Sequence, residues 1–512
     1  MSDFLPPAAI ALEATGAALT EHLSIRDRGV SDVQRRFYDT FDGLLHAAGL
    51  SAVHEGGVMS IVELATGAER AAAGISPPSR PVLAHELEPG PLREALLGVI
   101  KVRALMPIGR INARVHGVDV LDDSQKTVVR LSLERPQLAA GTGGDGTLGP
   151  RVRVTGVRGY DKALERVRNV LVRELGFAAA GRSLVEEAVI AAGGSPSGTS
   201  SKVDVPLAYE QRSDAAATLV LTRLLDVIRA NFDGAADDVD SEFLHDLRVA
   251  VRRSRSVQRQ LRSVFPAEDL AGFRSEFRWL QRATGAARDL DVYVLEFELT
   301  RALVPHGARA DLGPVLAALR LRRRSVREEM VRALRSPRTT NLLSDWGALL
   351  EGLIELPVDD RPGAARPVGE LAGERIRNLY KRMTKMGKAL DRTSPPVAYH
   401  ELRKKGKELR YVLELFGAQL WPAEVVKPMI KSLKSLQDVL GRHQDREVQI
   451  ETLRSLAGEV AAMPGGPAAL IATGVLTERL TLDEHAAREE FAERFSAFAH
   501  KQQRKLVQDT FR

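Results

Sequence analysis

One histidine and four arginines recur at helical spacing within residues 243–262, FLHDLRVAVRRSRSVQRQLR. These residues are His245, Arg248, Arg252, Arg255 and Arg259. At 3.6 residues per turn, their alternating steps of three and four residues place all five on one face of a helix. A solvated helix face normally alternates charges, whereas this face gathers like charges that repel each other. The pattern predicts a helix that presents an anion-binding face.

The same arrangement returns in residues 399–411, YHELRKKGKELRY. The repeated positions are His400, Arg403, Lys407 and Arg410, with Lys404 between them. The two histidines lie 155 residues apart, and two glycines downstream of them, Gly285 and Gly441, lie 156 apart in similar contexts. Self-similarity at a fixed distance indicates an internal duplication.

A third basic helix is predicted over residues 372–388, where Glu374 is the one acidic residue. Lys381, Lys385 and Lys388 share a face of this helix. We expect the three basic stripes to line one channel. For the two histidines, a satisfied core position is the alternative to a phosphate-binding role.

Composition sets broader bounds on the protein. A chain of 512 residues with 44% hydrophobic residues is long enough for two or more domains with their own cores. The net charge of +6 is mild, so the stripes are concentrated basic patches. Because there is no cysteine, disulfides, thiol catalysis and thiolate metal sites are excluded. No secretory signal or membrane span is predicted, and we expect a cytoplasmic protein.

The elements that position the stripes divide the chain into two parts. A Gly/Ser-rich stretch at 193–201 predicts a linker, because mixed patterns precede it and helical patterns follow it. We place an α+β domain at 1–195, the linker at 196–204 and an all-α domain at 205–512, with repeats at about 205–355 and 365–512. The fold class is therefore multi-domain.

Apolar periodicity locates the elements of both parts. Upstream, alternation predicts antiparallel strands at 59–64, 110–120, 127–133 and 151–157, with helices at 9–23, 90–101 and 162–175. Downstream, we expect helices at 208–231, 240–264, 268–284, 288–303, 312–335, 340–354, 368–391, 397–418, 424–440, 443–459 and 476–508. Their number and the duplication predict two up-and-down four-helix bundles.

The duplicated motifs resemble a known family. Leu244-His245-Asp246-Leu247-Arg248, His400-Glu401-Leu402-Arg403 and the intervening Arg288-Asp289-Leu290-Asp291 are similar to the conserved-histidine α-helical domain, CHAD, over about residues 205–505. The resemblance implies paired helical bundles whose basic surface binds inorganic polyphosphate, often at polyphosphate granules.

The first 200 residues resemble a degenerate CYTH, or triphosphate-tunnel, domain, which commonly precedes CHAD. Tyr38-Asp39-Thr40 and the strand at 110–120 carry the resemblance, which implies an antiparallel, tunnel- or barrel-like fold. Active members hold metal on a Glu-x-Glu-x-Lys strand, but here Glu13 stands alone and the later acidic strand retains only Glu134. Because a triphosphatase needs clustered carboxylates to hold divalent ions, we predict no catalysis, cofactor or metal.

The ligand predicted for the helical part is inorganic polyphosphate. Single-stranded nucleic acid is held partly by stacking on aromatic rings, and the stripe at 245–262 contains none, so nucleic acid is disfavoured as a partner. The predicted phosphate-binding residues are His245, Arg248, Arg252, Arg255, Arg259, Lys381, Lys385, Lys388, His400, Arg403, Lys404, Lys407 and Arg410. Two alternatives stay open: a Mg²⁺-dependent triphosphatase of the tunnel type, and a nucleic-acid-binding or scaffolding module.

Overall fold

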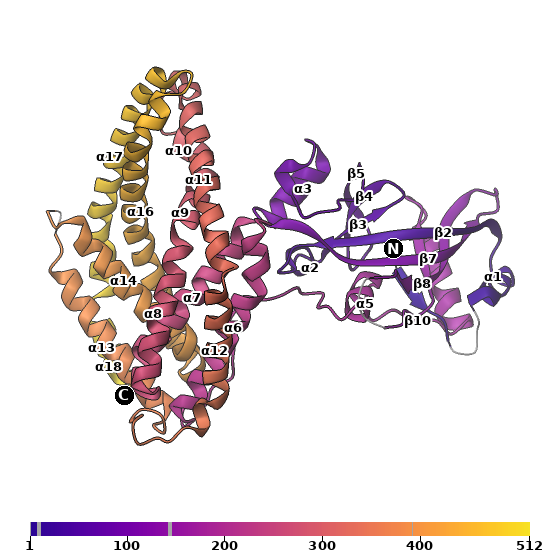
Figure 1. Cartoon of the computed structure of the whole chain (residues 1–512). Coiled ribbons are helices and arrows are strands. Elements are labelled where there is room, and N and C mark those ends of the chain that lie inside the picture. The colour runs from indigo at the N-terminus through magenta and orange to yellow at the C-terminus, as the bar shows by residue number, and fades with distance from the viewer. Residues whose placement is uncertain (1, 8–11, 142–145, 392) are drawn as a thin grey trace. The chain divides into compact units, whose positions relative to one another are not determined.

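The computed structural model describes residues 2–7, 12–141, 146–391 and 393–512 (Figure 1). The chain divides into two compact units, Met1–Ser201 and Lys202–Arg512. Their boundary falls within the predicted linker at 196–204. The helix predicted at 9–23 lies partly outside the described residues; its described part is α1, Leu12–Thr20, and the side chain of Glu13 is also outside them.

The first unit is built on an antiparallel sheet, which confirms the predicted class of this part. Its strands are β1 (Ser2–Leu5), β2 (Ile25–Asp39), β3 (Leu50–Glu55), β4 (Val58–Glu63), β5 (Glu69–Gly74), β6 (Val82–Leu83), β7 (Ala104–Leu121), β8 (Thr127–Leu138), β9 (Arg151–Gly156) and β10 (Ala178–Ala179). Its helices are α1, α2 (Leu44–Ala47), α3 (Pro91–Ile100), α4 (Asp161–Asn169) and α5 (Leu184–Ala191). The strand order is β10-β1-β9-β8-β7-β2-β3-β4-β5, with β6 beside β7.

The tunnel- or barrel-like closure predicted for this unit is wrong. In the described residues, β10 and β5 are the outer strands of an open sheet and do not pair with each other. One outer strand, β10, has only two residues, which is too short to extend the sheet toward closure. The predicted strands correspond to β4, β7, β8 and β9. The sequence did not reveal β1 or β2, because polar and exposed residues at Arg26–Gly29 interrupt the alternation in β2.

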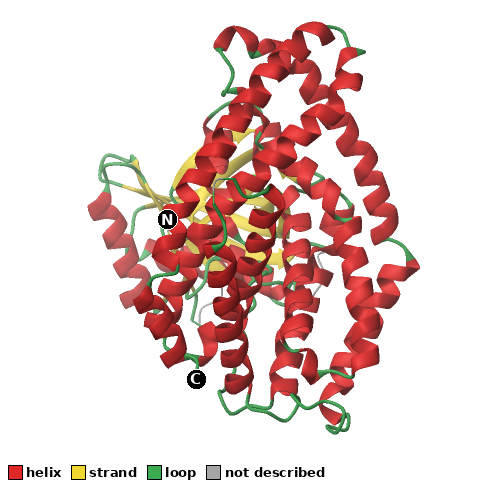
Figure 2. Cartoon of the chain, turned by 90° about the vertical axis from the view of Figure 1, so that its left-hand side faces the viewer, coloured by secondary structure: helices red, strands yellow, loops and turns green. Residues whose placement is uncertain are grey.

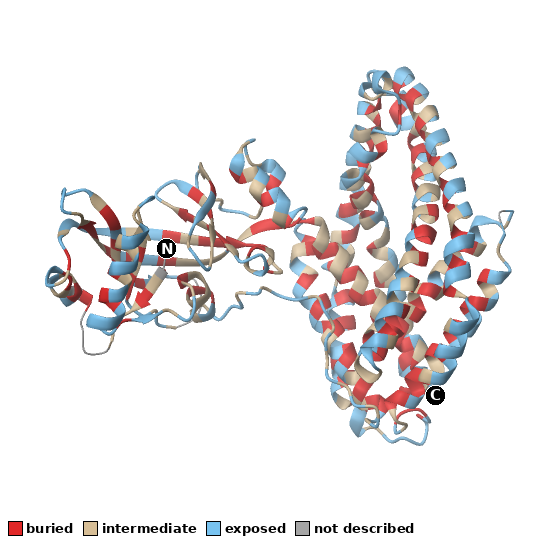
Figure 3. Cartoon of the chain, turned by 180° about the vertical axis from the view of Figure 1, so that it is seen from behind, coloured by how far each residue is buried: buried red, intermediate tan, exposed pale blue. Residues whose placement is uncertain are grey.

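The second unit is helical, as predicted. Its helices are α6 (Ser213–Ala236), α7 (Ser241–Gln260), α8 (Ala267–Ala283), α9 (Gly285–Leu295), α10 (Phe297–Arg301), α11 (Gly313–Leu334), α12 (Pro337–Gly352), α13 (Val368–Lys388), α14 (Pro396–Val412), α15 (Ala418–Leu420), α16 (Ala423–Ala461), α17 (Gly466–Phe498) and α18 (Lys501–Thr510). The axes of most of these helices are roughly aligned with one another (Figure 2). Buried positions gather on their inner faces (Figure 3), because apolar residues recur every three or four positions.

Three predicted helix boundaries in this unit are wrong. The helix expected at 288–303 is divided into α9 and α10. The helices expected at 424–440 and 443–459 form the single helix α16, which continues through Gly441. The helix expected at 476–508 begins earlier, as α17, and ends at Phe498 before α18. Glycine lowers helix propensity by only about 1 kcal/mol, so packing against neighbouring helices outweighs it. The division into two four-helix bundles stays a prediction.

Among the described residues, no helix combines the length and the apolar character that crossing a membrane requires.

Candidate anion-binding site

Helix α7 carries the first basic stripe as the sequence predicts. The side chain of Asp240 caps its start by accepting hydrogen bonds from the backbone N–H groups of Glu242 (2.9 Å) and Phe243 (3.3 Å). Leu244, Leu247 and Val251 are buried on one face. This packing fixes the rotation of the helix, so the cations on the adjoining face have defined positions.

Arg248 is the most buried member of this stripe, with 9% of its surface exposed. Its Nη1 donates at 2.9 Å to the backbone carbonyl of Gln281 and at 2.9 Å to Oγ1 of Thr284, both at the end of α8. Burial, followed by repulsion from Arg252, lowers the pKa of Arg248 to about 10. The guanidinium therefore joins α7 to α8 through the protein's own acceptors.

Arg403 occupies the matching place on α14. A side chain at Gly441 would bring its Cβ to 3.4 Å from Arg403 Nη2, and the corresponding distance from Gly285 to Arg248 Nη1 is 3.7 Å. Glycine at both positions thus leaves room for a guanidinium against the helix backbone. Arg403 Nη2 lies 3.5 Å from Oδ1 of Asp445, a more open contact than those of Arg248.

The two motif histidines also have matching partners. Nδ1 of His245 accepts a hydrogen bond at 3.1 Å from Arg288, and Nδ1 of His400 contacts the side-chain oxygen of Gln444. Arginine only donates hydrogen bonds, so Nδ1 of His245 carries no proton in this arrangement. Any contact from His245 to an anion must then use Nε2.

Two ion pairs join α7 to α14 and to the helical turn Leu413–Gly417 that follows it. Arg253 Nη2 lies 2.8 Å from Glu414 Oε2, and Arg259 pairs with Glu408. Glu408 also accepts from Gln260 at 3.0 Å and from Lys405 at 2.8 Å. Arg259, a predicted phosphate ligand, is therefore already partly neutralised by the protein.

The same two helices carry a cluster of cations with few acidic partners. We define the central cluster as Arg248, Arg252, Arg403, Lys407 and Arg410. Within the described part of the chain, Arg252 and Lys407 have no ion-pair partner, and Arg252 Nε is buried without a hydrogen bond. Burial, followed by Arg403 and Arg252, lowers the pKa of Lys407 to about 7. An anion bound here would relieve both the repulsion and the missing contacts.

The remaining predicted residues lie outside this cluster. Lys404 is half-exposed and pairs with Glu401. Lys381, Lys385 and Lys388 are exposed on α13. No described contact brings these three lysines to the central cluster, so a third wall of the channel stays a prediction.

Three arginines on α8 were not among the binding residues predicted from the sequence. Arg274, Arg278 and Arg282 follow one another at steps of four residues, which places them along one side of the helix. All three lower the pKa of Arg255, after burial and Arg259. Their even spacing in FRSEFRWLQR is visible in the sequence, but they lie outside the duplicated histidine motifs on which the prediction of binding residues rests.

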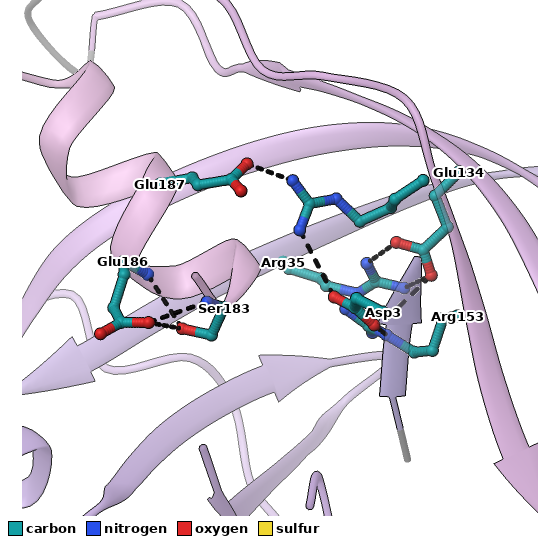
Figure 4. A network of polar contacts seen from close by, with 8 residues as sticks. Asp3, Arg35, Glu134, Arg153, Ser183, Glu186 and Glu187 are labelled. Atoms are coloured by element: carbon teal, nitrogen blue, oxygen red, sulfur yellow. Dashed lines mark hydrogen bonds and ion pairs between the residues drawn. The ribbon is translucent and has the colours of Figure 1, made fainter. Parts of the chain in front are cut away.

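The first unit contains a separate polar network on its sheet (Figure 4). Arg35 contacts both carboxylate oxygens of the buried Glu134, at 2.6 and 2.9 Å, and Glu55 at 2.5 Å. Arg153 reaches Asp3 at 3.1 Å and Glu134 at 3.7 Å. Burial alone would raise the pKa of Asp3, but Arg153 and Arg151 lower it. Within this network the arginines and the carboxylates neutralise one another.

This network borders a cleft of about 910 Å³, which includes Asp3, Arg35, Glu55 and Arg153 in its lining. Within the described residues, no group of three or more His, Asp or Glu side chains is placed to hold a metal ion. Glu134, the acidic residue retained from the predicted motif, directs its oxygens at arginines.

Known proteins are similar to this chain over part of its length. Two uncharacterized proteins of Mycobacterium tuberculosis are each 30% identical to this chain over 231 residues, which cover 43% of this chain and 40% of theirs. The match therefore spans less than half of these relatives. The crystal structure of the CHAD domain from the plant Ricinus communis shares 25% identity over 58% of this chain and 96% of its own, with a TM-score of 0.49. PptA from Streptomyces chartreusis shares 21% identity over 56% of this chain and 100% of its own, with a TM-score of 0.42.

The CHAD domain family itself matches residues 219–454. This segment includes α7, α8 and α14 and therefore the whole central cluster. The match agrees with the duplicated histidine and arginine motifs from which the sequence analysis started. Residues 219–454 of this chain are thus similar to the CHAD domain family.

Proposed function

We propose that the helical unit binds inorganic polyphosphate at the central cluster and performs no catalysis there. The observation that carries this proposal is the place of Lys407 beside Arg252, Arg403 and Arg410. Gathering like charges in a partly buried site opposes folding, so a function is needed to explain why they are retained. Phosphate oxygens supply both the negative charge and the hydrogen-bond acceptors that these side chains lack.

The chemistry of the cluster favours phosphate without bases over nucleic acid. Single strands need exposed aromatic rings for stacking. The aromatic ring beside the cluster is that of Tyr411, which is 4% exposed. Arg253 and Arg410 lie 5.8 and 5.5 Å from its centroid and form cation–π contacts with it. The ring is thus engaged by the protein, which supports polyphosphate as the ligand.

The CHAD resemblance gives independent support, because it implies polyphosphate binding and an association with polyphosphate granules. We extend the proposal to a granule-associated, cytoplasmic location. Fluorescent labelling of the full chain in cells stained for polyphosphate tests this extension. A diffuse signal that ignores the granules would contradict it.

For the first unit we propose a degenerate CYTH-like domain without triphosphatase activity. Its long antiparallel strands are compatible with that origin. Glu134 is the one acidic residue kept from the motif, and its contacts with Arg35 and Arg153 make it unsuited to metal binding. The alternative is a Mg²⁺-dependent triphosphatase. Phosphate release from tripolyphosphate with Mg²⁺ would establish the alternative, and we expect none.

The test of binding is a titration of the full chain with long-chain polyphosphate at two salt concentrations, with single-stranded DNA as competitor. The informative variant is Arg252→Gln/Lys407→Gln, because neither side chain holds another element in place. The matched control is Arg320→Gln/Arg479→Gln, which removes two exposed cations from α11 and α17. We expect tight, salt-sensitive binding that the first variant weakens and the control keeps, with a salt slope lower by about two units. Equal binding by both variants would contradict the proposal.

A further inference from the structure

The arginines of α8 form a basic stripe that no repeat motif contains. We define the α8 stripe as Arg274, Arg278 and Arg282. Arg278 and Arg282 are exposed and Arg274 is half-buried. In the described structure none of the three has an ion-pair or hydrogen-bond partner. Glu276, the acidic residue of α8 that lies within the stripe, is engaged by Arg338 of α12 at 2.6 and 2.9 Å, so it does not neutralise the stripe.

Arg255 connects this stripe to α7. Its Nη1 donates to the side-chain oxygen of Gln281 on α8, which holds the guanidinium against that helix. Burial lowers the pKa of Arg255, and the charges that lower it further are Arg259 and the three members of the α8 stripe. Cations of α7 and α8 therefore lie close together around Arg255, about one helical turn beyond Arg252 along α7.

The second half of the domain lacks an equivalent stripe. An offset of 156 residues maps the three positions onto Ile430, Lys434 and Asp438 of α16, so one cation remains and one position is acidic. Arg410, which corresponds to Arg255, lies 3.6 Å from Glu414. The α8 stripe is thus not repeated at the corresponding positions of α16, where Lys434 is the one cation among the three and the exposed Lys427 and Lys431 stand at other positions.

We infer that a polyphosphate chain held at the central cluster continues past Arg255 and over the α8 stripe, so that α8 is the long-chain part of the binding site. This inference rests on the proposed function. Short polyphosphates fill the central cluster and do not need α8. Longer chains add contacts with Arg274, Arg278 and Arg282, and each neutralised phosphate adds counterion release.

The experiment compares tripolyphosphate and long-chain polyphosphate as ligands of three full-length proteins. They are the wild type, Arg274→Gln/Arg278→Gln/Arg282→Gln, and the control Lys427→Gln/Lys431→Gln/Lys434→Gln. The control removes three exposed cations from the part of α16 that corresponds to α8. We expect the α8 variant to keep its tripolyphosphate affinity but to lose roughly tenfold or more in long-chain affinity, with a salt slope lower by about three units. The control should match the wild type.

Further variants keep the test decisive. Arg278→Gln alone should lower the long-chain salt slope by about one unit, and replacing all three arginines by lysine should largely restore it. Long-chain affinity and slope equal to those of the control would overturn the inference while leaving the proposed function intact. Absence of binding by the wild type would overturn both. Displacement by single-stranded DNA from the wild type, but not from the α8 variant, would assign the stripe to nucleic acid instead and overturn the inference.

Discussion

Arg253 of α7 and Glu414, in the helical turn Leu413–Gly417 that follows α14, are joined by a 2.8 Å ion pair, and the 155-residue offset of the histidine motifs maps this pair onto Glu408 and Arg259, which also pair. The charges at the equivalent positions are therefore reversed. In both pairs α7 supplies the arginine, and the glutamate comes from α14 or from the turn that follows it. Two similar helices thereby bind each other through complementary charge.

The shared carboxylate of Glu408 leads to a functional prediction. It is almost fully buried and accepts from Arg259, Gln260 and Lys405. Glu408→Gln would release Arg259 and Lys405 from ion pairing, so we expect tighter polyphosphate binding and a salt slope about one unit steeper. Titration at several salt concentrations measures both. Glu401→Gln, which frees only the half-exposed Lys404, is the control, and an equal effect of the two variants would argue against the special place of Glu408.

Arg248 should matter more for stability than for binding. Arg248→Ala removes the partner of Thr284 and of the Gln281 carbonyl, and it empties a buried space between α7 and α8. We expect a loss of about 1–3 kcal/mol in the free energy of unfolding. Urea unfolding of the full chain measures the loss. Arg252→Ala should cost little, since Arg252 has no such partner in the described structure; the opposite ranking would show that Arg248 is not a structural link.

Lys407 should make stability depend on pH. Burial, Arg403 and Arg252 lower its pKa from 10.5 to about 7, so between these values the unfolded chain binds a proton that the folded chain has released. Stability from this group therefore rises with pH across that window, and the full penalty is present below pH 7. We expect Lys407→Met to raise the Tm at pH 6 and to change it much less at pH 10. Equal shifts at both pH values would be inconsistent with this assignment.

The same amine should couple polyphosphate binding to pH. A polyanion binds the protonated form of Lys407 better, so the affinity of the wild type should fall as the pH rises from 6 to 8. Lys407→Arg keeps the charge at every pH in this range and should largely remove the dependence. Isothermal titration in buffers of different ionisation enthalpy would also detect the proton taken up. A pH dependence that persists in Lys407→Arg would point to another group.

Gly387 of α13 should be required for helix packing. A Cβ at this position would lie 2.1 Å from Cε2 of Phe495 on α17, so Gly387→Ala forces the ring or the helix to move. We expect a loss of about 1–3 kcal/mol. Gly474→Ala, in the middle of α17 with nothing within 4 Å of its Cβ, should instead stabilise by about 0.5–1 kcal/mol. Thermal unfolding of both variants separates the two effects, and stabilisation by Gly387→Ala would refute the close packing.

Glu134 should hold the sheet of the first unit together. Glu134→Gln leaves Arg35 buried without its main counter-charge, and we expect that unit to lose about 3–5 kcal/mol. Limited proteolysis of the full chain at increasing urea concentrations measures the unfolding midpoint of this unit. Glu165→Gln, in an exposed pair with Arg168, should have no measurable effect. An unchanged proteolysis midpoint in Glu134→Gln would mean that Arg35 is satisfied by other groups.

The basic stripes could be read from the sequence because a helix places residues three and four apart on one face wherever it lies. The same locality made the strands β4, β7, β8 and β9 predictable. It failed for β1 and β2, whose pairing depends on distant strands such as β9 and β7. Local sequence also wrongly predicted a helix end at Gly441. The close approach of Arg403, from another helix, explains why a glycine lies inside α16.

The sequence by itself determined the two histidine helices, their repeat and the gathering of like charges on one face of each, since these follow from residue type and spacing. Only the tertiary structure decided which cations are left for a ligand. Arg248 donates to acceptors 33 and 36 residues away, and Arg259 is paired with a carboxylate 149 residues away. Lys407 instead lies among other cations, which repel its charge more than nearby Asp445 attracts it. Ion pairs and hydrogen bonds depend on distances in space, and no spacing along the chain fixes which helix will lie alongside another.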